Sequence, residues 1–212
     1  MPKTTAAQRL KPRKSPVQRR SAQTVEAVLE AAARILETRG LAACTTNAVA
    51  ERAGVSIGSL YQYFPNRDAL TVALIERETV QLVADIEAAA LVESSRGSVL
   101  AMVRAAVAHQ MRRPVLARII DFEERRLPLG ERDQRLADLI HAALVGALTG
   151  KPGAPELDDA SLVAHDLLAI VRGMIDAAGE RDERGAAALE VRVMRAVDGY
   201  VAQSRRAHGE VV

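Results

Sequence analysis

The sequence is poor in the residues that build disulfide frameworks, zinc clusters and aromatic ligand cages. Its 212 residues include one cysteine, Cys44, no tryptophan, two phenylalanines and three tyrosines. A single cysteine excludes an internal disulfide and any multi-cysteine zinc site, so packing must stabilise the fold. Because three of the five aromatic rings fall within residues 61–64, an aromatic cage for a flat cationic ligand is not expected elsewhere. We expect no metal and no cofactor.

Long hydrophobic runs are also missing. No apolar stretch reaches the roughly 18 residues that a membrane span requires, and the basic N-terminal stretch lacks the apolar segment of a secretory signal. We therefore expect no membrane partner and a cytoplasmic location. Hydrophobic residues make up 49% of the chain and its net charge is +2, which is typical of a soluble globular protein with a sizeable core.

The small net charge hides an uneven distribution. Residues 1–80 contain 12 Lys and Arg against 7 Asp and Glu, whereas the remainder contains 17 against 20. Seven of the basic residues lie in residues 1–20, which contain no acid. A basic arm that leads into a compact segment indicates a polyanionic partner, although a solvated, disordered leader has the same composition.

The pattern of apolar residues is helical throughout. Alanine is abundant, alternating β-branched runs are absent, and apolar positions recur at spacings of three and four, which predicts an all-α protein of about nine helices. Gly40 is expected to end the first helix, and Thr45, Ser56 and Asn66 to cap the next three. The predicted helices cover residues 21–39, a short segment after Thr45, Ser56 to Pro65, a long segment from Asn66, and then 97–112, 114–126, 131–149, 159–179 and 186–204.

One motif has two incompatible interpretations. Gly54, Ser56 and Gly58 match G-x-S-x-G, the nucleophile elbow of serine hydrolases, which needs a β-strand that leads into the serine. Here a helix is predicted before Ser56. The four histidines are scattered, with no spacing that would place one beside the serine as the base of a catalytic triad. The same residues suit a sharp turn between two short helices, and we favour that interpretation.

Two short helices joined by a glycine-containing turn, after a longer supporting helix, form a helix-turn-helix whose last helix enters the major groove. Gly58, which would cost about 1 kcal/mol in a helix interior, lies in the first turn, where it lets the backbone approach DNA. Tyr61 and Tyr63 can extend their hydroxyls to phosphates, while Leu60 and Phe64 face the core.

Residues 45–70, TTNAVAERAGVSIGSLYQYFPNRDAL, resemble the DNA-binding segment of the TetR (tetracycline repressor) family of transcriptional regulators. The resemblance implies a ligand-responsive, dimeric repressor that binds a palindromic operator in double-stranded DNA, and no enzymatic activity. It implies phosphate contacts from Thr45, Tyr61, Tyr63 and Arg67 and base contacts from Ile57, Gly58, Ser59 and Gln62, with Asn47 and Ser56 also counted among the DNA-binding positions.

The segment departs from the family pattern at three places. Ile57 stands where the family often has a polar residue; it can contact a thymine methyl, and Gln62 can pair with adenine, so an A/T-leaning half-site is expected. Ala48 cannot complete a capping box with Thr45. Arg67 replaces the usual lysine, which keeps the charge and changes the geometry.

The last two predicted helices are candidates for self-association. A single recognition helix covers only a few base pairs, so a second copy related by two-fold symmetry is the usual solution. Residues 159–179 are apolar around most of the helix, more than one domain face requires, although a buried core helix has the same pattern. We expect a four-helix bundle between two copies, with contacts from Leu162, Leu167, Val171, Leu189, Val193, Val197 and Tyr200.

The middle of the chain is expected to bind the effector. The family resemblance implies a small-molecule pocket there, and aliphatic and methionine walls suit a flexible apolar ligand. Plain core packing is the commoner reason for a methionine at such positions. Cys44 is expected to be a small buried thiol, with oxidant sensing as the alternative. The candidate pocket residues are Met102, His109, Phe122, His141 and Met174.

These inferences divide the chain into a basic arm (1–20), a helix-turn-helix domain (21–67) and a helical effector-binding and dimerisation domain (68–212). One alternative function remains beside the hydrolase. A helical interaction protein of the same fold could regulate a protein partner and would not bind DNA.

Overall fold

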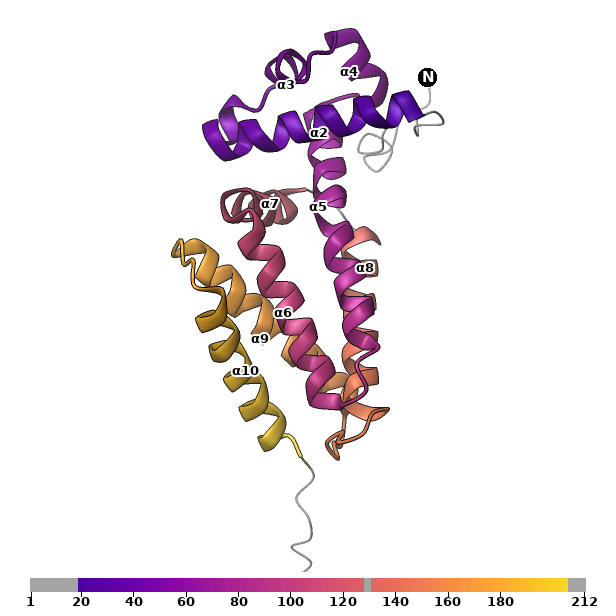
Figure 1. Ribbon diagram of the computed structural model, residues 1–212, viewed down its shortest axis with the longest axis vertical. Coiled ribbons are helices and arrows are strands. Elements are labelled where there is room, and N and C mark those ends of the chain that lie inside the picture. The colour runs from indigo at the N-terminus through magenta and orange to yellow at the C-terminus, as the bar shows by residue number, and fades with distance from the viewer. Residues whose placement is uncertain (1–18, 128–130, 206–212) are drawn as a thin grey trace, which may run out of the picture. The chain divides into compact units, whose positions relative to one another are not determined.

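The structure is a computed structural model that describes residues 19–127 and 131–205 (Figure 1). The basic arm predicted at residues 1–20 lies outside the described residues, apart from the backbone of its last two. In the described part the chain is all-α, as predicted, and an isolated bridge between Leu157 and Arg205 is its one β-type pairing. The helices are α2 (Arg19–Arg39), the 3-10 helix η1 (Leu41–Ala43), α3 (Thr46–Ala53), α4 (Ile57–Tyr63), α5 (Arg67–Ala90), α6 (Ser95–Arg112), α7 (Pro114–Arg126), α8 (Glu131–Thr149), α9 (Ala160–Glu180) and α10 (Ala186–Gln203).

The predicted caps are confirmed. The side-chain oxygen of Thr45 accepts a hydrogen bond from the backbone N–H of Ala48 (3.2 Å), and that of Ser56 accepts one from Ser59 (3.0 Å). Asn66 Oδ1 accepts a third from the N–H group of a residue in the first turn of α5 (2.8 Å). Each bond satisfies a backbone donor that the helix leaves unpaired.

The chain forms two compact units. The N-terminal unit contains Met1–Thr79 and Arg118–Leu129, and the C-terminal unit contains Val80–Ala117 and Gly130–Val212. Two helices, α5 and α7, therefore contribute residues to both units. The domain boundary predicted after residue 67 remains a prediction, but the unit that holds α3 and α4 also includes half of α5 and most of α7.

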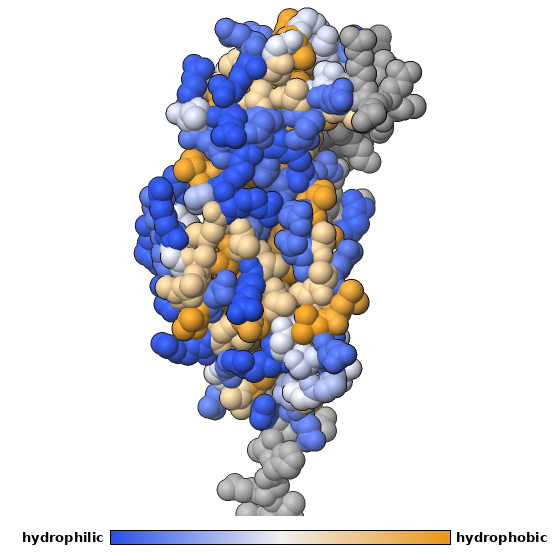
Figure 2. Space-filling view, in the orientation of Figure 1, coloured by the Kyte–Doolittle hydropathy of each residue, from blue (hydrophilic) through white to orange (hydrophobic). Residues whose placement is uncertain are grey.

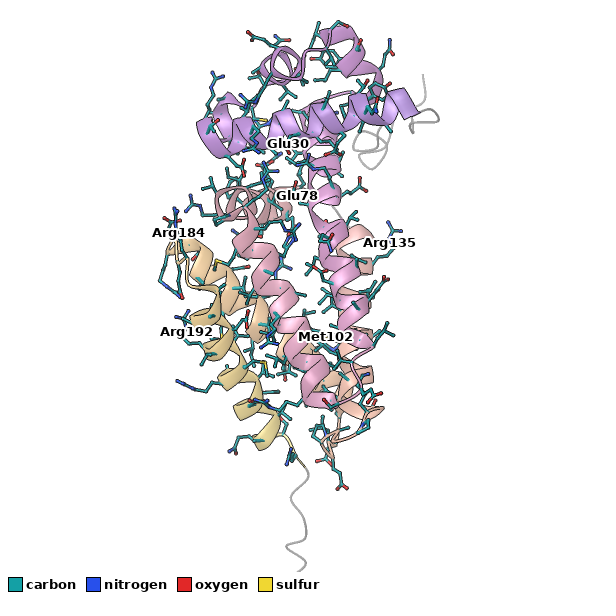
Figure 3. The ribbon with its side chains drawn as sticks, in the orientation of Figure 1. Glu30, Glu78, Met102, Arg135, Arg184 and Arg192 are labelled. Atoms are coloured by element: carbon teal, nitrogen blue, oxygen red, sulfur yellow. The ribbon has the colours of Figure 1, made fainter. Side chains whose placement is uncertain are left out.

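The core of the N-terminal unit lies where α2, α3 and α4 pack together. Full burial of one large aliphatic or aromatic side chain contributes about 1.5–3 kcal/mol. Arg77 of α5 also joins α2 at the surface by ion pairs with Glu26 (3.0 Å) and Glu30 (3.2 Å); Figure 3 labels Glu30 and the neighbouring acid Glu78. The largest buried side chains of this core are Val28, Ile35, Leu60, Phe64, Leu70 and Leu74.

The C-terminal unit is built on α6, α8, α9 and α10, which pack on one another. Met102 of α6, labelled in Figure 3, is buried in this core. Ion pairs from Arg96 to Asp198 (2.8 Å) and from Arg104 to Glu190 (3.2 Å) join α6 to α10 at the surface. Buried side chains from the four helices include Val107, Leu148, Leu167, Leu189, Val193 and Val197.

Candidate nucleic-acid interface

The turn between α3 and α4 depends on a left-handed glycine. Gly54 has φ 68° and ψ 29°, and its N–H donates to carbonyl oxygens of the last turn of α3. This conformation costs an L-residue roughly 1–2 kcal/mol and costs glycine nothing comparable. The segment that enters Ser56 is thus a helix followed by a tight turn, not a strand. The nucleophile-elbow interpretation is wrong, because an elbow needs a strand at that position.

One side of α4 is buried and the other is exposed. Leu60 is fully buried, whereas Ile57 and Tyr61 are 39% and 41% exposed, and Gly58 and Gln62 are also exposed. Exposed isoleucine and tyrosine side chains on so short a helix are available to a partner. The prediction that Leu60 and Phe64 face the core is confirmed, as Phe64 is also buried.

Gly58 has no internal reason to lack a side chain. A Cβ atom built there would meet only Ser56 Oγ, at 3.9 Å, which is an ordinary contact. The helical conformation of α4 suits any L-residue, and glycine weakens it by about 1 kcal/mol relative to alanine. The protein itself therefore has room for a side chain at this position. A side chain here would obstruct only a partner molecule that approaches the exposed side of α4.

Two hydroxyl pairs lie on this surface. Tyr61 Oη is 3.1 Å from Thr46 Oγ1 at the start of α3, and Ser56 Oγ is 2.8 Å from Ser59 Oγ. Ser59, predicted to contact a base, is half-buried and its hydroxyl is already bonded to Ser56. Thr46 was missed in the sequence because Thr45 explained the helix cap, and no local pattern indicates a bond between residues 15 positions apart.

The other predicted DNA-binding residues lie on the same two helices or just after them. Thr45 and Asn47 are exposed at the start of α3. The half-buried ring of Tyr63 lies 6.5 Å from that of Phe64, centroid to centroid, tilted by 50°. Arg67, the first residue of α5, is half-buried, and its Nε atom is buried without a hydrogen-bond partner.

Cys44 is a buried thiol beside this surface. Its Sγ is 3.9 Å from the carbonyl oxygen of Ala32. Burial raises the pKa of the Cys44 thiol, the charge of Arg67 opposes the rise, and the charge of Glu123 adds to it. A protonated, buried thiol is a poor nucleophile and a poor target for oxidants. This environment fits the expectation of a structural cysteine.

A buried carboxylate, which the sequence did not indicate, lies in the part of α7 that belongs to the N-terminal unit. Glu123 is 1% exposed, and Arg126 covers it with Nε 3.1 Å from Oε2 and Nη2 2.7 Å from the same oxygen. Arg126 Nη2 also donates to Asp68 Oδ1 in the first turn of α5 (2.6 Å). The hydrogen bonds with Glu123 and then Asp68 raise the pKa of Arg126. This ion triad fastens α7 to the start of α5.

The predicted pocket residues are divided between the two units. Met102 is buried in the core of the C-terminal unit, half-buried Met174 packs against the same core, and His109 of α6 is half-buried. Phe122 belongs to the N-terminal unit and is 53% exposed, so its assignment to the pocket is corrected. Spacing alone could not show that an aromatic residue on an amphipathic helix would face outward.

His141 contacts a second histidine. Its ring lies 3.9 Å from that of His165, centroid to centroid, and its Nε2 is 3.1 Å from the carbonyl oxygen of Ser161. His165 Nδ1 is 2.9 Å from the same oxygen and its side chain is exposed. The two rings therefore join α8 to the first turn of α9, and the assignment of His141 to the pocket stays a prediction.

Four of the seven residues predicted to contact a second copy are buried within one chain, so their assignment to the dimer interface is corrected. A side chain with almost no exposed surface in one chain has no surface left for a second copy. Leu162 is instead 57% exposed, Val171 is half-buried, and half-buried Tyr200 donates a short hydrogen bond from α10 to Asp166 of α9. The four residues that belong to the core of the C-terminal unit are Leu167, Leu189, Val193 and Val197, each at most 2% exposed.

A three-helix unit with a tight αL turn and an exposed second short helix is a helix-turn-helix, so the fold and this surface define a protein of the DNA-binding class. Comparison with known proteins makes the assignment specific. Residues 28–74 match the model of the bacterial regulatory proteins of the tetR family, and residues 98–200 match that of a tetracyclin repressor-like C-terminal domain. The chain belongs to the TetR family of transcriptional regulators, which are DNA-binding transcription factors and not enzymes.

The relatives in sequence match part of the chain. It is 41% identical over 64 residues to the HTH-type transcriptional repressor KstR of Mycolicibacterium smegmatis, a match that covers 30% of this chain and 31% of the relative. An uncharacterized HTH-type transcriptional regulator of Mycobacterium tuberculosis is 39% identical over 64 residues, which is 30% of this chain and 32% of the relative. The chain thus matches about a third of the length of these curated relatives.

Solved structures match nearly the whole fold. A TetR-family regulator from Streptomyces coelicolor superposes with a TM-score of 0.66 at 24% identity and covers 86% of this chain and 98% of its own. A TetR-family regulator from Mesorhizobium loti gives 0.68 at 19% identity, with 88% and 98% covered. In the described residues, no helix combines the length and the apolar character that a membrane crossing needs.

Proposed function

We propose that the chain is a dimeric repressor that binds a palindromic operator through α4 and leaves it when a small apolar molecule binds the C-terminal unit. The observation that carries the proposal is the exposed side of α4, where Gly58 has no side chain although the protein has room for one. The relative KstR carries the name of a repressor. A cytoplasmic location is part of the proposal.

The exposed side chains of α4 suggest how DNA is read. Ile57 can pack on a thymine methyl and the amide of Gln62 can form two hydrogen bonds with adenine, while Gly58 provides clearance. We assign phosphate contacts to Thr45, Tyr61, Tyr63 and Arg67, and keep Asn47 and Ser56 in the contact set. Ser59 was predicted to contact a base. Its hydroxyl is already hydrogen-bonded to that of Ser56, so it has less hydrogen-bonding capacity left for DNA.

Gly58→Leu tests this interface directly. The variant should fold at least as well as the wild type, since a Cβ meets no close contact and leucine favours helix. Its affinity for an inverted-repeat duplex, identified by scanning the DNA that flanks the gene, should fall more than about tenfold, a change of about 1.4 kcal/mol. Its affinity for a random-sequence duplex should fall less, because phosphate contacts tolerate a larger separation than base contacts.

Gly146→Leu is the matched control. Gly146 lies exposed in α8 of the C-terminal unit, and a Cβ there would meet nothing within 4 Å. This variant should bind both duplexes like the wild type. Equal losses on the two duplexes for Gly58→Leu, or no loss, would contradict the role of α4. A wild-type chain that fails to bind either duplex but retains a protein partner in pull-downs would favour the helical interaction protein.

Self-association is proposed through the outer faces of α9 and α10. Leu162 and Val191 are 57% and 59% exposed, and exposed small residues accompany them on both helices. Small side chains let two helices approach closely. In the space-filling view, hydrophobic residues lie among hydrophilic ones on the visible face of the C-terminal unit (Figure 2). The accompanying small residues are Ala169, Gly173, Ala188, Gly199 and Ala202.

The double variant Leu162→Glu/Val191→Glu tests this surface. Both side chains are exposed in one chain, so the charges should not disturb its own core, and light scattering after gel filtration should show the mass of a monomer. DNA affinity should fall, because a monomer lacks the recognition helix of the second subunit. A variant that keeps the mass of a dimer would exclude these faces as the contact.

The effector is proposed to be apolar and aliphatic. The core of the C-terminal unit is aliphatic apart from methionines, with Met102 buried and Met174 at its edge. The buried side chain of Gln110, next to His109, packs close to Gly179. Linear alcohols and carboxylic acids of graded length should raise the melting temperature and weaken DNA binding in parallel. An effect restricted to aromatic cations would contradict this class.

A further inference from the structure

The two short helices of the helix-turn-helix are joined at the surface by one hydrogen bond between side chains. Thr46 Oγ1, in the first residue of α3, lies 3.1 Å from the hydroxyl oxygen of Tyr61 in α4. This distance is slightly longer than the usual O–H···O range of about 2.5–3.0 Å, so the hydrogen bond is a long one. Tyr61 is 41% exposed, so the bond lies where a partner of α4 would approach.

The protons of this pair limit what it can offer to a ligand. Each hydroxyl has one proton and two lone pairs, and one of the two protons is used between the residues. One O–H group therefore remains for donation outward, whichever residue is the internal donor. Neither side chain carries a positive charge. A phosphate oxygen, which accepts hydrogen bonds and donates none, complements the remaining donor.

We propose that Thr46 is a positioning residue for Tyr61 and that the pair contacts one DNA phosphate as a single unit. The inference rests on the proposed function, because it requires the exposed side of α4 to face DNA. The bond holds the Tyr61 hydroxyl in place relative to both helices before DNA binds. A preorganised side chain has less conformational entropy to lose on binding, so affinity rises without a further contact.

This arrangement predicts that the two residues do not act independently. Thr46→Val keeps the branched shape and removes the hydroxyl, and Tyr61→Phe removes only the phenolic oxygen. In a bound dimer each variant removes two such bonds, so DNA affinity should fall about two- to tenfold for each subunit, the range for one neutral hydrogen bond. The double variant should bind hardly more weakly than Tyr61→Phe, because Thr46 acts through Tyr61. The combined loss should therefore be smaller than the product of the single losses, by about two- to tenfold for each subunit.

Two properties distinguish a phosphate contact from base reading and from a charge contact. The losses should be equal on a random-sequence duplex and on the inverted-repeat duplex, because phosphates carry no sequence information. The slope of log K against log salt should be unchanged, because a neutral hydroxyl neutralises no phosphate. Arg67→Ala should instead make that slope less steep by about 0.9 for each subunit of the bound dimer, or about 1.8 in all, because each phosphate contact contributes about 0.9.

The experiment is a fluorescence anisotropy titration of duplexes of about 30 base pairs, close to three helical turns, from about 50 mM salt upward. Thr46→Ser, which restores the hydroxyl, should recover most of the wild-type affinity. Thr38→Val is the matched control, because Thr38 is exposed on α2 and its hydroxyl donates to the carbonyl oxygen of Arg34 in the same helix. Thr46→Val combined with Tyr63→Phe should give the product of its single losses. Thermal denaturation without DNA verifies that every variant folds.

The possible outcomes separate this inference from the proposed function. If the wild type binds neither duplex, the proposed function fails. If the wild type binds and Arg67→Ala changes the salt slope, the function stands. The inference is then overturned if the losses from Thr46→Val and Tyr61→Phe multiply, or if Thr46→Ser binds no better than Thr46→Val.

Discussion

Replacing Arg126 should lower the free energy of unfolding, because it leaves the carboxylate of Glu123 buried without its cation. Glu123 is 1% exposed, and Arg126 is its cation, with Nη2 2.7 Å from Oε2. Arg126→Met keeps much of the side-chain volume and leaves the carboxylate buried without a partner. Breaking a buried ion pair in this way typically costs about 3–5 kcal/mol. Arg126 is itself 41% exposed, so water can reach the vacated position and the low end of the range applies.

Urea unfolding at pH 7 measures this loss of unfolding free energy. We expect a loss of about 3 kcal/mol for Arg126→Met at pH 7, and recovery of most of it in Arg126→Met/Glu123→Gln, which removes the charge. Arg34→Met is the control, because Arg34 pairs with Glu30 at the surface (2.8 Å), with side chains 58% and 41% exposed; its loss should stay below about 1 kcal/mol. Equal losses for the two arginine variants, or a double variant no more stable than Arg126→Met, would refute the reasoning.

Two further predictions concern single residues. Gly54→Ala should lower the unfolding free energy by about 1–2 kcal/mol, because φ is 68° there while a Cβ meets nothing within 4 Å; Gly146→Ala, the same change within a helix, should raise it by about 0.5–1 kcal/mol, and chemical denaturation of both variants measures the difference. Burial raises the pKa of Cys44, so above about pH 8.5 the unfolded chain loses its thiol proton before the folded one and stability falls as the pH rises. The stability advantage of the wild type over Cys44→Ala should therefore shrink between pH 8 and pH 10, and an unchanged difference would show that the thiol titrates normally in the fold.

Local signals in the sequence determined the helices and the turn between α3 and α4. Thr45, Ser56 and Asn66 cap helices where their type and position predicted, because a cap acts over three residues and needs no distant partner. Gly54 marked the turn for the same reason, since its left-handed backbone is a property of one residue. The motif that surrounds Ser56 indicated the family for the same local reasons.

Only the tertiary structure decided which apolar faces turn inward. α9 and α10 are apolar on more than one side, and periodicity does not say which side packs within the chain. The fold buries Leu167 and Val193 in its own core and leaves Leu162 and Val191 outside. Phe122 is exposed for a related reason, since hydrophobicity favours burial without specifying a site for every residue.

Contacts between distant segments could not be predicted from the sequence either. The Thr46–Tyr61 bond and the contact of Arg126 with both Glu123 and Asp68 join residues on different helices. Their formation depends on how the helices pack, and the residue types alone allow many other pairings. The sequence by itself thus determined the class of protein and its recognition helix α4, because both follow from interactions between residues that are close in the sequence. The packing of the helices decided which side chains are paired, buried or free to meet a partner.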